Sequence, residues 1–416
     1  MIHMIPRVPD PALRRLTRTL YGYAFLSDLV LLYPLYVVFF ADTGLSVGQI
    51  SSLFVLWSAA GILFEVPSGA WADVVSRRLL LCLAPLVTAA GYALWVLLPS
   101  YPAFAVGFLL WGAGGALVSG ALEALVWTEL DRLGAAGRYA RVLGRARTAG
   151  VLGVVLSGVL AGPVLAAGGY PVVGAASVLA CLLAATVAAR FPEHRAAPVA
   201  GESAAPDDGD LGWWETLRAG VAQVHTRPAV RSAVLLVAVV AADWGALDEY
   251  IPLLALDTGV GARAVPLLLL LLWAGVTVGG LLAPAGERLG GRGYGALLGL
   301  VGVALAGGAL LRHPAGFVLL AVAFGAAQLA TVLADARLQA RITGDSRATV
   351  TSLAGMATDL LIIGTYTAYG LLATAVGNAV AFAVTAGPYL LLALVLLRRR
   401  RRPAAVPVGV AVPGST

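Results

Sequence analysis

The chain has 416 residues, of which 60% are hydrophobic and only 12% are charged, and its formal net charge is +6. A soluble protein of this length needs far more charge to cover its surface, so this composition excludes an ordinary soluble domain. All 28 basic residues are arginine, and the absence of lysine excludes a P-loop nucleotide site and a Schiff-base enzyme.

Apolar stretches recur along the chain at the length that a membrane span requires. About 20 residues of helix cross a hydrocarbon core of roughly 30 Å. The sequence therefore predicts an all-α membrane protein of twelve transmembrane helices in two six-helix halves. The spans are expected at 20–40, 50–71, 79–98, 102–127, 147–167, 171–190, 230–254, 264–286, 294–311, 315–338, 348–372 and 376–397.

The spans divide the chain into five segments. A short segment, 1–19, precedes the first half at 20–190, and a tail, 398–416, follows the second half at 230–397. The linker 191–229 contains several prolines and acidic residues, which is typical of a flexible connection. Apolar residues repeat at helical spacing over 212–226, so we expect an amphipathic helix there. It would lie on the membrane interface or pack against the underside of the bundle.

The arginines are distributed unevenly between the two sides of the predicted bundle. All but Arg263 and Arg312 fall in the termini, in the linker or in connections on the same side as the termini. The positive-inside rule therefore predicts that both termini are cytoplasmic in a multi-pass protein of the cell membrane. The first span is too long for a signal peptide and contains Asp28, so we expect it to be retained.

One connection carries a recognisable motif. Gly69-Ala-Trp-Ala-Asp73-Val-Val-Ser-Arg77-Arg78, between the second and third spans, resembles the G-x-x-x-D-x-x-G-R-R/K loop of the major facilitator superfamily. The twelve spans, the central linker and a similar connection after the eighth span extend the resemblance over the chain. Ser76 replaces the second glycine of the motif.

The resemblance implies a secondary transporter that works by alternating access between its two halves. It also implies a gating role for Gly69, Asp73, Arg77 and Arg78, because in this family the aspartate faces the positive N-terminus of the eleventh helix. The alternative is a charged turn that only fixes topology. The stretches 64–69 and 119–125 look like those of bacterial drug or small-molecule exporters.

Carboxylates inside the spans are the next candidates, because a charge at mid-membrane costs about 2.5–3.5 kcal/mol and is usually retained for a task. We expect Asp28, Asp243 and Asp359 to couple transport to protons, with Asp28 as the main acid. Tyr21 and Phe25 share a helical stripe with Asp28, and these residues with Trp244 and Tyr366 are the expected substrate contacts. The alternative for each acid is a structural ion pair or hydrogen bond with a neighbouring helix.

Glu123 and Glu65 are two further acids inside the predicted spans. Glu123 continues a stripe of small residues, Gly112, Gly115 and Ser119, so it is expected to face a packed neighbour. Arg145 or Arg147 could pair with it as a structural or gating ion pair, and a coupling site is the alternative. Glu65 lies close enough to the cytoplasmic end to be hydrated, and a coupling role and a structural one remain open for it.

The residue types missing from the spans narrow the substrate. No arginine lies near mid-membrane to balance an anion, and amide side chains, which sugar sites use, are scarce. The histidines lie outside the spans or at their ends, and Cys82 and Cys181 are interpreted as small buried hydrophobes, so no metal site is expected.

These observations predict a proton-driven exporter of amphipathic, neutral or cationic small molecules. We expect it to act as a monomer in the lipid bilayer, with no cofactor besides the proton gradient and no nucleic-acid partner. Hydrolase and metalloprotease motifs are absent from the sequence, which disfavours an enzyme. An uptake permease and a non-transporting receptor or scaffold on the same fold remain alternatives.

Overall fold

The computed structural model describes residues 11–194, 213–342 and 347–398. Within these ranges, the side chains of 65–74, 213–217, 219–220 and 347–348 lie outside the description. The expected tail after Arg398, the N-terminal ten residues and residues 195–212 of the linker are therefore outside the described residues. The described chain forms helices joined by short connections, as expected for an all-α membrane protein.

The first half contains seven α-helices and one 3₁₀ turn. In chain order these are α1 (Pro11–Asp28), α2 (Tyr36–Asp42), α3 (Val47–Val74), α4 (Arg77–Leu97), α5 (Tyr101–Val118), α6 (Ala121–Arg132), η1 (Ala136–Arg138) and α7 (Tyr139–Ala188).

The linker contains α8 (Trp213–Thr226), where the amphipathic helix was predicted. The elements of the second half are α9 (Pro228–Leu247), η2 (Asp248–Tyr250), α10 (Ile251–Asp257), η3 (Ala262–Ala264), α11 (Val265–Leu281), α12 (Ala283–Gly286), α13 (Gly291–Leu310), α14 (Gly316–Gln339), α15 (Arg347–Val376), α16 (Asn378–Thr385) and α17 (Gly387–Arg398). Helix α8 packs against α9 and α15, on the underside of this half.

Within the described residues, ten helical stretches are long and apolar enough to cross a membrane. One of them runs over 136–188 and contains two predicted spans. These two spans join at Gly168 and Gly169, where the backbone leaves helical geometry and Gly169 has a positive φ of 67° that disfavours other residues. The pair α1 and α2 covers the first predicted span, so the architecture is consistent with twelve spans.

The first predicted span, 20–40, is not one continuous helix. Helix α1 ends at Asp28, and α2 starts only at Tyr36. Pro34 lies between them, and proline removes a backbone N–H and disfavours helical geometry before it. Because unpaired backbone groups are costly in a membrane, the break needs partners from neighbouring helices.

Two buried serines of α7 supply those partners. The Leu32 N–H donates to Ser177 Oγ at 2.9 Å, and Ser157 Oγ donates to the Val30 carbonyl at 2.6 Å. Ser157 and Ser177 come from the two spans that α7 contains. The packing of α7 against α1 and α4 therefore holds an irregular segment, 29–35, inside the bundle.

The seventh span is interrupted at the corresponding place in the second half. Helix α9 ends at Leu247, a 3₁₀ turn covers Asp248–Tyr250, and α10 follows with Pro252 in its first turn. Proline is tolerated at that position because the N–H it lacks would have no partner within the helix. Both halves thus start with a span that is interrupted by backbone outside the α-helix, at 29–35 and at Asp248–Tyr250.

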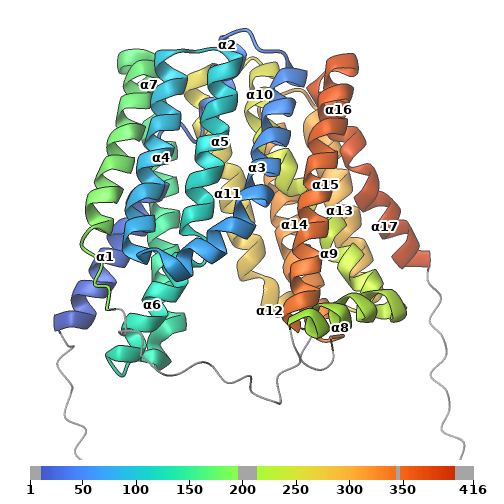
Figure 1. Cartoon of the computed structure of the whole chain (residues 1–416). Helices are drawn as coiled ribbons and strands as arrows, with labels where there is room; N and C mark the ends of the chain where they lie inside the picture. Colours follow the sequence, from blue (N-terminus) through green and yellow to red (C-terminus); the bar gives the residue numbers. More distant parts are fainter. Residues whose placement is uncertain (1–10, 195–212, 343–346, 399–416) are drawn as a thin grey trace, which may run out of the picture.

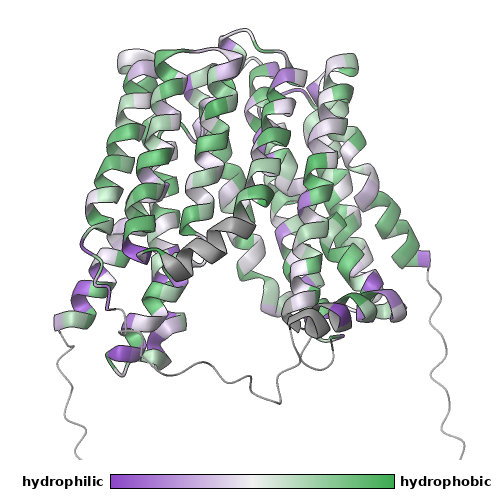
Figure 2. Cartoon of the chain, in the orientation of Figure 1, coloured by the Kyte–Doolittle hydropathy of each residue, from purple (hydrophilic) through white to green (hydrophobic). Residues whose placement is uncertain are grey.

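The two halves meet near α2 and α10 and diverge toward α6 and α8 (Figure 1). We call the face where α1 begins and α17 ends the terminal face, and the face with α2 and α10 the opposite face. Hydrophilic residues gather toward the helix ends, and hydrophobic residues occupy the middle of the bundle (Figure 2). The halves contact one another through α2 with α10, α3 with α15, and α7 with α11.

Candidate functional site

A central cavity of about 490 Å³ lies between the two halves. The first half contributes residues of α3, α5 and the residue after α5, and the second half contributes residues of α9, η2 and α15. The described residues that line it are Trp57, Ser58, Gly61, Ile62, Trp111, Gly112, Gly115, Ala116, Ser119, Gly245, Glu249, Asp359, Ile362 and Tyr366.

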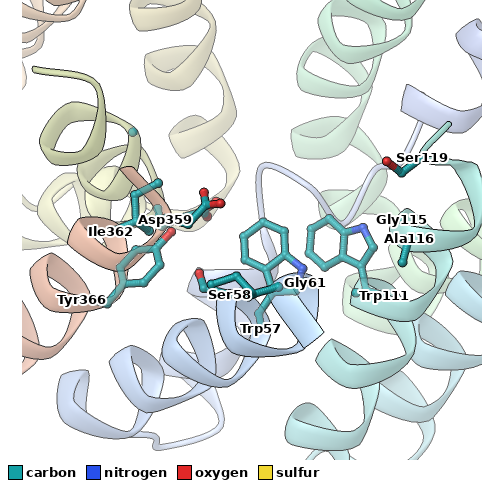
Figure 3. A pocket seen from close by; sticks show the side chains of 14 residues that line it. Trp57, Ser58, Gly61, Trp111, Gly115, Ala116, Ser119, Asp359, Ile362 and Tyr366 are labelled. Atoms are coloured by element: carbon teal, nitrogen blue, oxygen red, sulfur yellow. The ribbon is translucent and has the colours of Figure 1, made fainter. Parts of the chain in front are cut away.

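The wall of the first half is aromatic. The rings of Trp57 on α3 and Trp111 on α5 stack with centroids 4.9 Å apart (Figure 3). Phe108, one helical turn before Trp111, stacks on the Trp111 ring with centroids 5.9 Å apart. Tyr33, from the broken first span, packs edge-on against Trp111 with centroids 5.3 Å apart. Glycine and alanine on α5 leave open space beside the rings. This wall therefore presents flat, polarisable surface to a bound molecule.

The wall of the second half carries the charge. Glu249 lies in the 3₁₀ turn η2, and Asp359 and Tyr366 come from α15, across the cavity from the indoles (Figure 3). Glu249 accepts a hydrogen bond from the hydroxyl of Tyr36, in the first turn of α2. None of the described lining residues is basic. The cavity is consequently acidic on one side and aromatic on the other.

A cluster of aromatic side chains closes the cavity toward the opposite face. Tyr250 is fully buried, stacks on Tyr369 at 3.7 Å, and donates a hydrogen bond to Ser51 Oγ at 2.8 Å. Phe54 packs on Tyr366 at 5.2 Å. Because Ser51 and Phe54 belong to the first half and the tyrosines to the second, this cluster joins the halves.

Asp248 precedes Glu249 but does not line the cavity. It contacts Trp273 of α11, and its Oδ1 atom is buried without a hydrogen-bond partner in the described part of the chain. Two carboxyl groups therefore occupy adjacent positions in the break of the seventh span. A carboxylate buried among apolar helices is costly unless it is paired or protonated.

Two of the predicted site residues, Asp359 and Tyr366, line the cavity. Asp28, the expected main proton-coupling acid, does not appear among its described lining residues. Its carboxylate packs against Gly150 of α7. A Cβ atom added at Gly150 would lie only 2.2 Å from Asp28 Oδ2. Tyr21 and Phe25 are half-buried on α1, and they too are absent from the lining residues of this cavity.

Asp243 and Trp244 also lie off the cavity, within the second half. Asp243 is only 6% exposed, and its Oδ2 atom has no hydrogen-bond partner among the described residues. Trp244 donates its indole N–H to Thr331 Oγ1 at 3.1 Å, and its backbone N–H to the hydroxyl of Tyr389 at 3.1 Å. These contacts fix Trp244 against α14 and α17, one residue from Gly245 of the cavity wall.

Glu249, the cavity acid that is hydrogen-bonded across the two halves, was not among the predicted site residues. Glu249 and its neighbour Asp248 fall within the predicted span 230–254, so the rule that selected the other intramembrane acids would also have selected them. The indoles of Trp57 and Trp111 were not selected either. Hydrophobic periodicity offers no signal for them, because α3 and α5 are apolar on all sides.

The motif between the second and third spans is described only in part. The side chains of Gly69 and Asp73 lie outside the described residues, as does that of Glu65. Arg77 starts α4, and its guanidinium donates to Thr128 Oγ1 at 3.0 Å. Arg78 is exposed. The gating role of these four motif residues stays a prediction.

Ser76, which replaces the second glycine of the motif, has a local function. Its Oγ accepts from the Leu79 N–H at 3.1 Å, as a helix N-cap does, and donates to Glu193. Glu193 also accepts from the Arg77 N–H at 2.8 Å. The segment after α7 is thereby tied to the start of α4.

The expected pairing of Glu123 with Arg145 or Arg147 is not observed. All three side chains are exposed, and no ion pair among the described residues joins them. The physical reason is a break at Ser119 and Gly120, after which α6 no longer continues the stripe of small residues on α5. The gating role proposed for these residues stays a prediction.

Solved structures with this fold are known, although their sequences are distant. The nucleoside transporter NupG (D323A mutant) aligns over 92% of this chain and 99% of its own, with a TM-score of 0.72 and 13% identity. A bacterial homologue of the human lysosomal transporter Spinster, in an inward-facing and unoccupied conformation, aligns over 95% and 100%, with a TM-score of 0.68 and 17% identity. A D-xylose-proton symporter aligns over 92% of this chain and 97% of its own, with a TM-score of 0.62 and 17% identity.

No curated protein matches the sequence closely enough to transfer a function. The family model described as Major Facilitator Superfamily matches residues 20–296, from the first span to the start of α13. This match covers more than half of the chain, and the fold of the solved structures agrees with it. The chain therefore belongs to the major facilitator superfamily, and it is a multi-pass membrane transporter.

Proposed function

We propose that this transporter carries amphipathic organic cations and couples their movement to protons at Glu249 and Asp359. The observation that carries the proposal is the composition of the central cavity. Two carboxylates on the second half face a pair of stacked indoles on the first half, and none of the described lining residues is basic.

The cavity matches a cation with an apolar body better than an anion. A cation over an indole gains about 0.5–2 kcal/mol, depending on how far it is desolvated. Glu249 and Asp359 add charge complementarity, whereas an anion would find no basic side chain among the described lining residues. A volume of about 490 Å³ lies within the range of small-molecule sites.

Proton coupling follows from competition for the same carboxylates. A carboxylate between apolar helices is stabilised either by a bound proton or by a bound cation, and the two ligands exclude one another at one site. The hydrogen bond from Tyr36 makes this exchange sensitive to the relative position of the halves, because Tyr36 and Glu249 lie on different halves. Asp28 and Asp243 are the alternative coupling acids.

Alternating access would require the aromatic cluster to open. Tyr250, Tyr369 and Ser51 close the opposite face, so we infer that this conformation gives access from the terminal face, which is predicted to be cytoplasmic. Export is the direction we propose. It rests on the resemblance of the stretches 64–69 and 119–125 to bacterial exporters.

The test is transport by the full chain in proteoliposomes with an imposed pH gradient. Tetraphenylphosphonium serves as the lipophilic cation, and a nucleoside and a neutral sugar serve as comparison substrates. We expect gradient-driven movement of the cation. Glu249→Gln should abolish its accumulation, and the control Asp131→Asn, an exposed acid on α6, should not.

Three outcomes would count against the proposal. Transport of the nucleoside or the sugar without the cation would overturn the substrate class. Cation movement that ignores the pH gradient would overturn coupling. Accumulation only when the gradient is reversed would show an uptake permease, the alternative direction for the same fold.

A further inference from the structure

A second cavity, of about 1010 Å³, lies away from the central one and entirely within the second half. It is a groove between α9 and α17, with parts of α13 and α14 behind it. The residues that line it are Ser232, Leu235, Leu236, Val239, Leu289, Gly290, Gly291, Arg292, Gly293, Tyr294, Arg337, Arg341, Leu392, Val395 and Leu396.

Three arginines stand at the end of this groove near the terminal face. Arg337, near the C-terminal end of α14, is held in place, because its guanidinium lies 3.9 Å from the centre of the Tyr294 ring and donates to the Leu289 carbonyl at 3.1 Å. Arg292 in the first turn of α13 and Arg341 after α14 are exposed. The groove therefore holds one fixed positive charge and two that can approach a ligand.

The rest of the groove is apolar and runs toward the middle of the membrane. Leu235 and Val239 of α9 form one wall, and Leu392 and Val395 of α17 form the other. The distance from Ser232 to Val239 along α9 is about 10 Å, as follows from the rise of an α-helix. Leu235 is 54% exposed and Val395 45%, so these walls are open to the surrounding lipid.

The charge of the groove is not balanced by its own residues. No acidic residue is among its described lining residues. Asp335 lies two positions before Arg337 on α14 and so points to a different side of that helix. An anionic group bound at Arg292 and Arg341 would therefore meet positive charge that no described lining residue of the groove balances.

We propose that this groove binds one anionic phospholipid, with its phosphate at Arg292 and Arg341 and an acyl chain between α9 and α17. Charge complementarity selects the headgroup, and the apolar walls select the chain. A free inorganic anion would use only the arginines, and a neutral lipid would use only the walls. The site does not depend on the transported substrate, since it shares no residue with the central cavity.

The experiment titrates the purified full chain, in neutral detergent, with phosphatidylglycerol and with phosphatidylcholine of the same acyl chains. Bound lipid is counted by native mass spectrometry. Each arginine near a membrane surface strengthens binding of anionic lipid about fivefold. The double variant Arg292→Gln/Arg341→Gln should therefore bind phosphatidylglycerol about 25-fold more weakly.

The matched control is Arg14→Gln/Arg15→Gln, which removes two exposed arginines from the same face but from the first half. It should leave binding unchanged. Equal losses in both double variants, or equal binding of the two lipids to the native protein, would overturn the proposal. Competition by millimolar inorganic phosphate would show an anion site without a lipid and would overturn it as well.

A second variant tests the acyl chain and leaves the arginines intact. Val395→Trp places a large side chain between α17 and α9, on an exposed position where folding should tolerate it. It should weaken binding of long-chain phosphatidylglycerol more than binding of its short-chain analogue. Equal binding of both analogues to this variant and to the native protein would contradict the placement of the chain.

Discussion

The hydroxyl of Tyr36 donates a hydrogen bond to the carboxylate of Glu249, and this one bond joins the broken first span to the broken seventh span. The two residues are 213 positions apart in sequence. The bond lies between the central cavity and the aromatic cluster of the opposite face. It therefore connects a candidate proton site to the contact that keeps that face closed.

Removing this bond should favour opening of the opposite face. A hydrogen bond to a charged group contributes about 1.5–3 kcal/mol, so Tyr36→Phe should shift the conformational equilibrium by tenfold or more. The measurement is labelling of Gly61→Cys, a cavity position with free space, in a variant without the native cysteines. An impermeant maleimide added to intact cells should react faster when Tyr36 is replaced.

Tyr170→Phe is the matched control, because it removes a tyrosine-to-carboxylate bond, to Asp42, within the first half. Its labelling rate should equal that of the parent. If Tyr36→Phe and Tyr170→Phe label at the same rate, the bond does not hold the halves together.

Loss of the stacked indole should weaken substrate binding more than it lowers the maximal rate. Trp57→Ala removes one indole of the stacked Trp57–Trp111 pair. The lost cation–π and apolar contact weakens the binding free energy of the cation by about 1–2 kcal/mol. The KM for tetraphenylphosphonium should rise about 5- to 30-fold. Trp127→Ala, at an exposed tryptophan on α6, should leave KM unchanged. An equal rise in both variants would show that the effect comes from general destabilisation.

Two acids compete for the coupling role, and one experiment separates them. Sequence patterns favour Asp28, whereas the cavity favours Glu249, because the carboxylate of Asp28 lies against Gly150 of α7. We expect Asp28→Asn to lower the transport rate but to retain gradient-driven accumulation of the cation, and Glu249→Gln to abolish it. The measurement is flux of the cation into proteoliposomes with and without the pH gradient. If Asp28→Asn abolishes accumulation and Glu249→Gln retains it, Asp28 is the coupling acid.

The irregular segment 29–35 should depend more on Ser177 than on Ser157. Ser177→Ala leaves the buried N–H of Leu32 without its partner, which costs about 1–3 kcal/mol. Ser157→Ala costs less, because the Val30 carbonyl still accepts from the Tyr33 N–H at 3.1 Å. The apparent Tm in detergent should fall further for Ser177→Ala. The exposed Ser52→Ala should leave it unchanged, and the opposite order would refute the assignment.

The orientation of the bundle can be tested directly. The distribution of arginines predicts that the terminal face is cytoplasmic, so an epitope added after Arg402 should react with antibody only after permeabilisation. An epitope inserted after Gly259, on the opposite face, should react in intact cells. Labelling of the C-terminal epitope without permeabilisation would invert the topology.

The spans could be predicted from sequence because each one is a local property. Twenty apolar residues cross a membrane whatever their neighbours are, and the arginines that flank them respond to the membrane rather than to one another. The family could be recognised for the same reason, since the loop from Gly69 to Arg78 is a short local pattern. Asp359 and Tyr366, which the sequence singles out as a polar and an aromatic group within a long apolar span, line the cavity, and their coupling and binding roles stay predictions.

Tertiary structure decided where spans break and which side chains meet. Pro34 was visible in the sequence, but a break after Asp28 is possible only because Ser157 and Ser177 of α7 satisfy its backbone. The stacking of Trp57 on Trp111 and the bond from Tyr36 to Glu249 depend on how α3, α5 and the two halves pack. Contacts between distant segments carry no signal in local periodicity, so the acidic and aromatic walls of the cavity emerge only in the folded chain.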